Sequence, residues 1–177
     1  MQSPHGAADQ VSVRRVHPSD GDALNSFYAA LSADARRARF LASGPGPNAS
    51  VTQTFCTPDH QHEEGFVATT TDGAVVGHLC LASVSSDTVE LGVAVADEWQ
   101  GNGVGRLLFE AAVEWARDNR VVRLVATAFA GNTRVLRLLS SAPQPPLVSW
   151  ANGGVVEVVI PLAGPLPTTR SWPPYSF

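Results

Sequence analysis

A glycine-rich segment near the middle of the chain has the composition of an anion-binding loop. Residues 100–106 read Gln-Gly-Asn-Gly-Val-Gly-Arg and lie between an apolar stretch and an amphipathic one. Closely spaced glycines let the backbone curl so that successive N–H groups point into one concavity. A helix that follows directly adds free N–H donors and the positive end of its dipole. The segment predicts a cradle for a pyrophosphate, although a tight strand-to-helix turn without a ligand would use the same glycines.

Two common nucleotide-binding patterns do not fit this segment. The Walker loop ends in Gly-Lys followed by Ser or Thr, and all twelve basic residues of this chain are arginine. The Rossmann fingerprint spaces its glycines as GxGxxG in the first β-α-β unit, whereas residues 101–105 read GxGxG and follow at least three expected strands. The loop therefore predicts a different phosphate-bearing ligand.

A carboxylate lies in the apolar stretch before this loop. Glu90 belongs to the segment TVELGVAV, residues 88–95, and its apolar neighbours are expected to raise its pKa towards the range of a general base. The alternative is an edge-facing glutamate that pairs with an arginine, because most strand carboxylates are solvated.

The elements that must position these residues alternate between strand and helix. Residues 88–95 and 121–127 read as strands on either side of an amphipathic helix that begins at Val104, which is typical of a parallel crossover unit. The other expected strands cover residues 11–16, 65–71, 74–83, 147–150 and 155–162. The other expected helices begin after Asp20, after Ser32 and at Asn132, whereas residues 42–49 are expected to form a loop.

The pattern predicts an α/β protein with one domain over residues 11–162. Residues 1–10 are expected to form a flexible tail and residues 163–177 a proline-rich tail. Pro145 and Pro146 have no amide hydrogen, so the strand after them must start later or lie at a sheet edge.

Charge and composition argue against several classes of protein. A net charge of -4 argues against a nucleic-acid binder and against contact with an anionic membrane. Cys56 and Cys80 lack metal-site spacing and are expected to be reduced thiols of a cytoplasmic protein. The pair His60 and His62 is expected to lie in a solvated loop without a metal, and His78 is expected to be a core histidine.

The loop and its surroundings resemble the acyl-CoA-binding segment of the GNAT superfamily of N-acetyltransferases. That signature is Gln or Arg, two residues, Gly, one residue, and Gly or Ala, and residues 100–105 satisfy every position. Residues 13–40, 89–117 and 130–139 look like corresponding parts of the bacterial protein-lysine acetyltransferase branch. The resemblance extends over about residues 11–162.

The resemblance implies a fold, a donor substrate and a set of site residues. It implies an α+β domain whose mixed sheet of six or seven strands splays between the fourth and fifth strands, at a bulge near residues 93–95. Acetyl-CoA is the implied acyl donor, with Glu90 as general base and the N–H of Val95 polarising the thioester carbonyl. The implied cofactor-binding residues are Val93, Val95, Gln100, Gly101, Asn102, Gly103, Val104, Gly105, Arg106 and Asn132.

Two positions depart from the superfamily pattern. Leu139 stands where many members have a tyrosine that protonates the leaving thiolate. The protein-acetylating branch also lacks this tyrosine. Residues 140–146 replace the usual Gly-Phe pair in a region that commonly shapes the acceptor pocket or a dimer contact. The expected function is acetyl transfer to an amine, a protein lysine above all. The alternatives are a small amine or antibiotic as acceptor, and a non-catalytic acyl-CoA sensor or partner subunit; a homodimer is possible.

Overall fold

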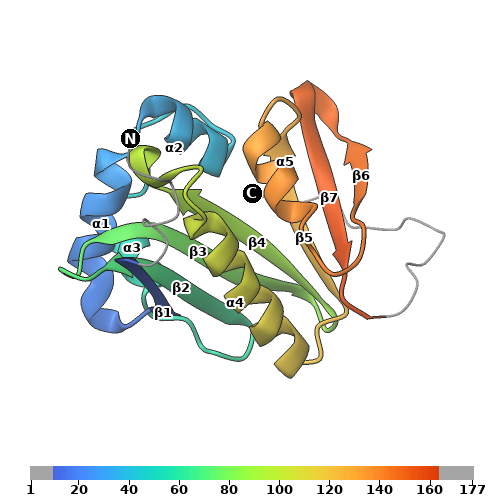
Figure 1. Cartoon of the computed structure of the whole chain (residues 1–177), viewed down its shortest axis with the longest axis horizontal. Helices are drawn as coiled ribbons and strands as arrows, with labels where there is room; N and C mark the ends of the chain where they lie inside the picture. The colour runs from blue at the N-terminus through green and yellow to red at the C-terminus, as the bar shows by residue number, and fades with distance from the viewer. Residues whose placement is uncertain (1–9, 164–177) are drawn as a thin grey trace.

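A mixed seven-stranded sheet forms the centre of the computed structural model, which describes residues 10–163 (Figure 1). The strands lie across the sheet in the order β1-β2-β3-β4-β5-β7-β6. They are β1 (Val11–Arg15), β2 (Glu63–Thr70), β3 (Val75–Ser85), β4 (Thr88–Val95), β5 (Arg123–Phe129), β6 (Leu147–Trp150) and β7 (Val155–Pro161). The two expected tails lie outside the described residues, apart from residues 10 and 163.

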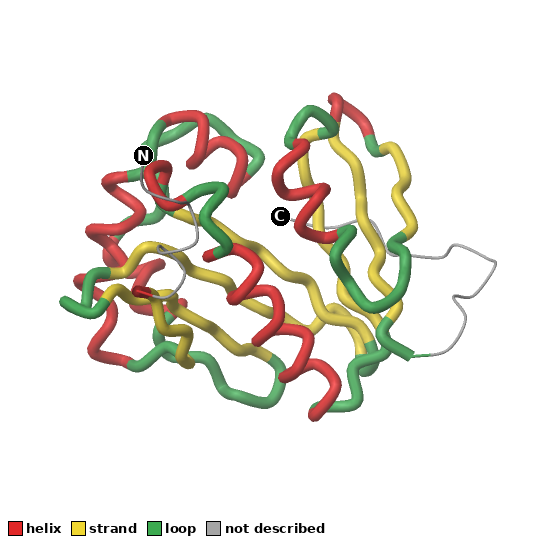
Figure 2. Tube along the Cα trace, in the orientation of Figure 1, coloured by secondary structure: helices red, strands yellow, loops and turns green. Residues whose placement is uncertain are grey.

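Helices cover both faces of this sheet. They are α1 (Gly21–Ala30), α2 (Ala33–Phe40), α3 (Ala49–Phe55), α4 (Val104–Asp118) and α5 (Thr133–Leu139). One buried cluster packs α4 and α5 against one face, and a second packs the three N-terminal helices against the other. Figure 2 shows α4 and α5 in front of the strands, with the N-terminal helices grouped at the left of the view. Within residues 10–163, no helix is long and apolar enough to cross a membrane.

The sheet splays between β4 and β5, as the family resemblance implies. These strands pair in parallel over three residue pairs only, from Thr88 with Arg123 to Glu90 with Val125. Beyond Glu90 both strands continue without pairing to each other. There β4 pairs only with β3, and β5 pairs only with β7. An opening therefore begins directly after Glu90.

The prediction of a bulge near residues 93–95 is wrong. The register of β4 with β3 runs without a shift from Val89 to Val95, and its only shift lies at the hairpin end, between Ser83 and Ser85. The strands separate without an extra residue in β4, because β5 follows its antiparallel partner β7 away from β4.

One helix was not predicted. Residues 42–48 form the expected loop, but α3 begins at Ala49, and the Asn48 side chain caps it by accepting from the Val51 N–H at 3.0 Å. The segment is rich in Thr and Val, which have modest helix propensity, so its helical pattern is weak. Packing stabilises this helix, since the Phe55 ring contacts the buried His78 ring with 5.4 Å between their centres.

The C-terminal hairpin agrees with the prediction. Strand β6 begins directly after Pro146, pairs only with β7 and forms one edge of the sheet. A proline before an edge strand leaves no ladder hydrogen bond unmade.

Candidate active site

The glycine-rich segment forms the turn between β4 and α4, after the short 3-10 helix η3 (Asp97–Trp99). Gly101 and Gly103 have φ values of 79° and 88°, which side chains other than glycine rarely adopt. Among the described residues, the N–H groups of residues 101–105 donate to no acceptor, whereas the Arg106 N–H donates to the Gly103 carbonyl at 3.0 Å. Five free amides therefore gather at the N-terminus of α4, where an anion is stabilised.

Side-chain hydrogen bonds hold this turn against its neighbours. Gln100 donates from Nε2 to the Val95 carbonyl at 3.0 Å and accepts from Arg134 of α5 at 2.6 Å. Asn102 donates from Nδ2 to the Glu98 carbonyl at 3.2 Å. These contacts fix the loop between the end of β4 and the start of α5, so its amides are oriented in advance of binding.

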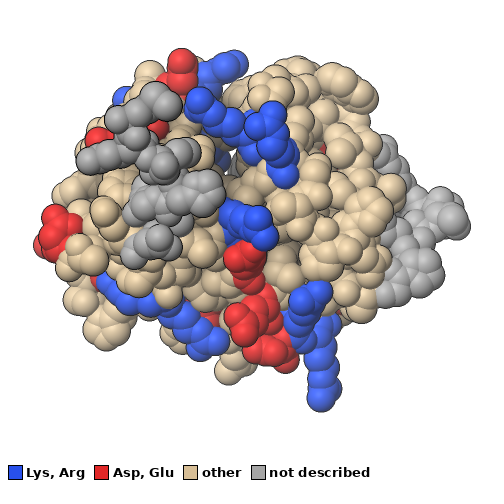
Figure 3. All heavy atoms as spheres, viewed as in Figure 1, with Lys and Arg blue, Asp and Glu red and all other residues tan. Residues whose placement is uncertain are grey.

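The remaining loop-side residues have local roles in the structure. Asn132 caps α5, because its Oδ1 accepts from the Val135 N–H at 3.3 Å. Arg106 is exposed and pairs with Glu110 on α4 at 2.8 Å. Figure 3 shows blue side chains in the upper middle of this face of the molecule, with red acidic side chains directly below them. Positive charge beside free amides suits a phosphate-bearing ligand.

The edge of β4 that faces the opening carries unpaired amides. The Ala96 N–H donates to Val76 of β3 at 2.9 Å. Successive peptide groups of a strand point to opposite sides, so the N–H groups of Val93 and Val95 point towards β5, which does not pair with them. The Val95 carbonyl points the same way and accepts from Gln100. This edge can therefore pair with an extended ligand as a sheet edge pairs with a strand.

Glu90 lies at the start of the opening, on the face opposite α4. It shares that face with Ala94, which packs in the cluster of the N-terminal helices. Burial raises the pKa of Glu90, the charge of Arg39 opposes this shift and the charge of Glu157 adds to it. Among the described residues the Glu90 carboxylate makes no hydrogen bond or ion pair. A half-buried carboxylate with a raised pKa and no partner is suited to accept a proton.

Arg39 of α2 is a neighbour that the sequence analysis did not single out. Its guanidinium donates to Cys80 Sγ at 2.9 Å and lies against Gly92 of β4. A Cβ atom at Gly92 would lie only 2.6 Å from Arg39 Cζ, so glycine is required for this close approach. The glycine within an apolar strand was the one signal in the sequence that pointed to such a contact.

His78 is a core histidine, as predicted. It is fully buried, and its Nδ1 is 2.8 Å from the Tyr28 hydroxyl. Burial, together with a smaller effect of the Arg39 charge, lowers the pKa of His78 to about 3. The imidazole is therefore neutral at physiological pH and lies in the packing between α1 and β3.

We expect His78 to make the protein less stable in acid. The group has a pKa of about 3 when folded against an ordinary value of 6.5, so only the unfolded chain takes up its proton between those values. Stability is full above pH 6.5 and falls as the pH decreases, by up to ~1.4 kcal/mol per pH unit. Urea unfolding between pH 7 and pH 5 measures this slope.

The His78→Gln variant tests the assignment, since glutamine can still bond the Tyr28 hydroxyl but does not titrate. Its slope between pH 7 and pH 5 should be shallower than that of the wild type, whatever its absolute stability. Equal slopes in wild type and His78→Gln would contradict the prediction.

The histidines near β2 make local contacts only. His60 lies 3.1 Å from Glu64, and His62 lies 3.0 Å from Asp59. In the part of the chain that the structure describes, no three histidine, cysteine or acidic side chains form a group that could hold a metal ion.

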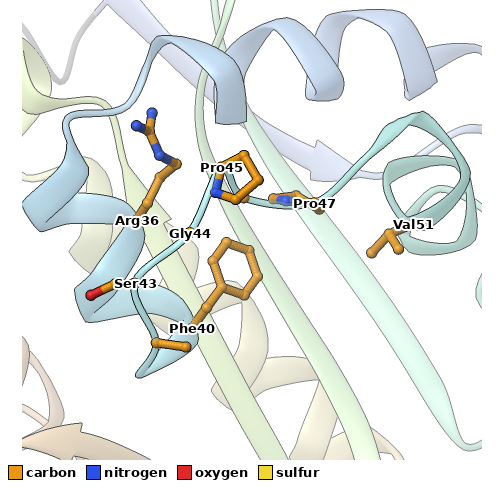
Figure 4. A pocket seen from close by; sticks show the side chains of 9 residues that line it. Arg36, Phe40, Ser43, Gly44, Pro45, Pro47 and Val51 are labelled. Atoms are coloured by element: carbon orange, nitrogen blue, oxygen red, sulfur yellow. The ribbon is translucent and has the colours of Figure 1, made fainter.

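A shallow pocket of about 280 Å³ lies between α2 and the loop that follows it (Figure 4). Figure 4 shows Phe40 beside the prolines of this loop, with Val51 of α3 at the far side. Its lining consists of Arg36, Phe40, Ala42, Ser43, Gly44, Pro45, Gly46, Pro47 and Val51. None of the residues around the opening between β4 and β5 belongs to it, so it is separate from the candidate site.

The model of a family described as "Acetyltransferase (GNAT) family" matches residues 27–141. This match begins within α1, ends just after α5, and includes Glu90 and the glycine-rich turn. The chain belongs to the GNAT family of acetyltransferases. It is accordingly an N-acyltransferase with acetyl-CoA as its acyl donor, and the five free amides with the unpaired edge of β4 fit that donor.

Solved structures of GNAT proteins share this fold. The GNAT domain of S. lividans PAT is similar at a TM-score of 0.77 and 24% identity, over 85% of this chain and 90% of that chain. A phosphinothricin acetyltransferase from Sinorhizobium meliloti, in complex with AcCoA, has a TM-score of 0.68 and 16% identity, over 86% and 88% of the two chains. Spermidine N-acetyltransferase from Vibrio cholerae, in complex with CoA and spermine, has a TM-score of 0.64 and 16% identity, over 87% and 96%. No curated protein matches the sequence.

Proposed function

We propose that this GNAT protein transfers the acetyl group of acetyl-CoA to a primary amine, with Glu90 as general base. The observation that carries the proposal is the opening between β4 and β5, which has free loop amides at one end and an unpaired carboxylate at the other. The family resemblance of residues 13–40 and 89–117 to the protein-lysine branch favours a protein lysine as acceptor.

On the donor side, the free amides of residues 101–105 bind the pyrophosphate. Arg106 adds positive charge beside them, Gln100 holds the loop in place, and Asn132 contacts the ligand from the start of α5. The pantetheine arm pairs with the edge of β4 at Val93 and Val95. The Val95 N–H donates to the thioester carbonyl and stabilises the negative charge that develops on its oxygen, an effect worth ~2.7–4 kcal/mol in other systems.

On the acceptor side, Glu90 removes the proton that blocks the reaction. A lysine ammonium has a pKa of about 10.4 and no lone pair, so Glu90 takes one proton, directly or through water. The free amine attacks the carbonyl carbon and the C–N bond forms. The nitrogen then loses its second proton to water, and the C–S bond breaks. The sulfur leaves as a thiolate and takes a proton from water, because Leu139 offers none and the thiol pKa is near 8.5.

The two substrates reach the opening from opposite faces of the sheet. The loop amides lie at the start of α4, whereas Glu90 faces the side of the N-terminal helices. This arrangement lets the donor and the acceptor occupy the opening together, as direct transfer requires.

Calorimetry and a thiol-release assay test the proposal. Purified protein should bind acetyl-CoA and release free CoA with a lysine peptide, a lysine-rich protein or spermidine as acceptor. Because the chain contains no lysine, any acetyl-lysine found by mass spectrometry must lie on the acceptor. Lack of acetyl-CoA binding would contradict the proposal. Binding without thiol release from any acceptor would favour a non-catalytic acyl-CoA sensor. The cytoplasmic location and a homodimer stay predictions.

A further inference from the structure

The face of the sheet that carries Glu90 carries a second half-buried carboxylate, that of Glu157 on β7. Glu90 is paired with Val125 of β5, and Thr127, two residues further along β5, is paired with Glu157. Paired residues point to the same face, and so do residues two apart on one strand. Among the described residues neither carboxylate makes a hydrogen bond or an ion pair.

The helix α2 bridges the opening on this same face. The guanidinium of Arg37 lies 4.4 Å from the centre of the Phe129 ring at the end of β5. The guanidinium of Arg39 lies against Gly92 of β4. One helix therefore contacts both separated strands, and the region beneath it has Glu90 on the β4 side and Glu157 beyond β5.

The charges around Glu90 would not attract an ammonium ion without Glu157. Gly92 lies two residues after Glu90 on the same face, about 7 Å away along the strand, and the Arg39 guanidinium covers it. Glu90 and Arg39 together have no net charge, so their combined pull on a cation is small. Glu63 of β2 also lies on this face, one strand away from β4 as Glu157 is, but Glu63 is exposed, so water screens its charge. Arg37, over the Phe129 ring at the end of β5, adds a second positive charge on this face. Glu157 offsets that charge, so that the region does not repel an ammonium ion.

We propose that Glu157 is a specificity-determining residue of the acceptor site, which draws in acceptors that arrive as ammonium ions and disfavours those with a carboxylate near the amine. This inference rests on the proposed function. The acceptor class is a cationic primary amine, such as a lysine side chain in a peptide or a polyamine.

Kinetics of the Glu157→Gln variant test this role. As acceptor we choose a peptide with one lysine, whose N-terminus is acetylated and whose C-terminus is an amide. With it we expect KM to rise about tenfold and kcat to change less than threefold. The difference from wild type should shrink between 25 mM and 200 mM NaCl, because salt screens the charge. The charge of Glu157 raises the pKa of Glu90, so the acid limb of the pH profile of kcat/KM should move to lower pH. The Kd for acetyl-CoA should not change.

The Glu63→Gln variant is the matched control, since it removes the same charge from the same face. It should keep the wild-type KM, salt dependence and pH profile, and Glu157→Asp should restore the wild-type KM. A wild-type KM in Glu157→Gln, or an equal effect in Glu63→Gln, would overturn the inference.

The wild-type protein gives a test that needs no variant. Putrescine, butylamine and 4-aminobutyrate have the same four-carbon chain with an amine at one end. At the other end putrescine carries a second ammonium, butylamine carries no charge and 4-aminobutyrate carries a carboxylate. We expect kcat/KM to fall in that order, and an equal or reversed order would overturn the inference. Absence of transfer to any amine would instead refute the proposed function itself.

Discussion

Glu90→Gln is expected to reduce acetyl transfer by 10²–10⁴-fold at neutral pH without changing the affinity for acetyl-CoA. The substitution keeps the size and polarity of the side chain but removes its ability to take a proton, and general-base catalysis contributes rate factors of that size. Acetyl-CoA affinity should persist because the free amides of residues 101–105 lie at the other end of the opening. The thiol-release rate and calorimetry measure the two effects separately.

The pH dependence of this variant distinguishes a lost base from a damaged site. Near pH 10 a large fraction of a lysine acceptor is already the free amine, which needs no base. The rate of Glu90→Gln should therefore approach that of the wild type as the pH rises. A rate close to wild type at pH 7 would show that Glu90 is not the base, and an equally large defect at pH 10 would point to disturbed geometry.

Gly103→Val is expected to weaken acetyl-CoA binding by at least 30-fold. The φ of Gly103 is 88°, a conformation that a β-branched residue cannot adopt without strain, so the turn must change its path. The free amides of residues 101–105 then no longer converge. Each hydrogen bond to a charged group contributes about 1.5–3 kcal/mol, so one or two lost bonds account for the expected change. Calorimetry with acetyl-CoA gives the Kd.

Gly73→Val is the matched control for this substitution. Gly73 has the same φ of 88°, lies in the turn between β2 and β3, and a Cβ there would meet nothing within 4 Å. The backbone strain should lower the thermal stability of both variants similarly, but only Gly103→Val should lose affinity. Wild-type affinity in Gly103→Val, or an equal loss in Gly73→Val, would contradict a specific role of the loop.

Short-range patterns accounted for most of the fold. The bounds of β4 and the start of α4 agree with the prediction, because strand alternation, glycine spacing and helical periodicity are all local properties. The Ser32 cap of α2 was predicted for the same reason, and its hydroxyl accepts from the Ala35 N–H at 3.1 Å. The helix α3 was missed because its stability comes from the packing of Phe55 rather than from its own residues.

The site itself divides in the same way. The sequence predicted the glycine-rich turn of residues 100–106 and the position of Glu90 in a strand. Both features are formed by residues that are neighbours in the chain. The face to which Glu90 points, its neighbours Arg39 and Glu157, and the absence of a bulge in β4 were decided only by strand register and helix packing. Residues far apart in the chain meet through these long-range pairings, and local preferences do not determine which of them meet.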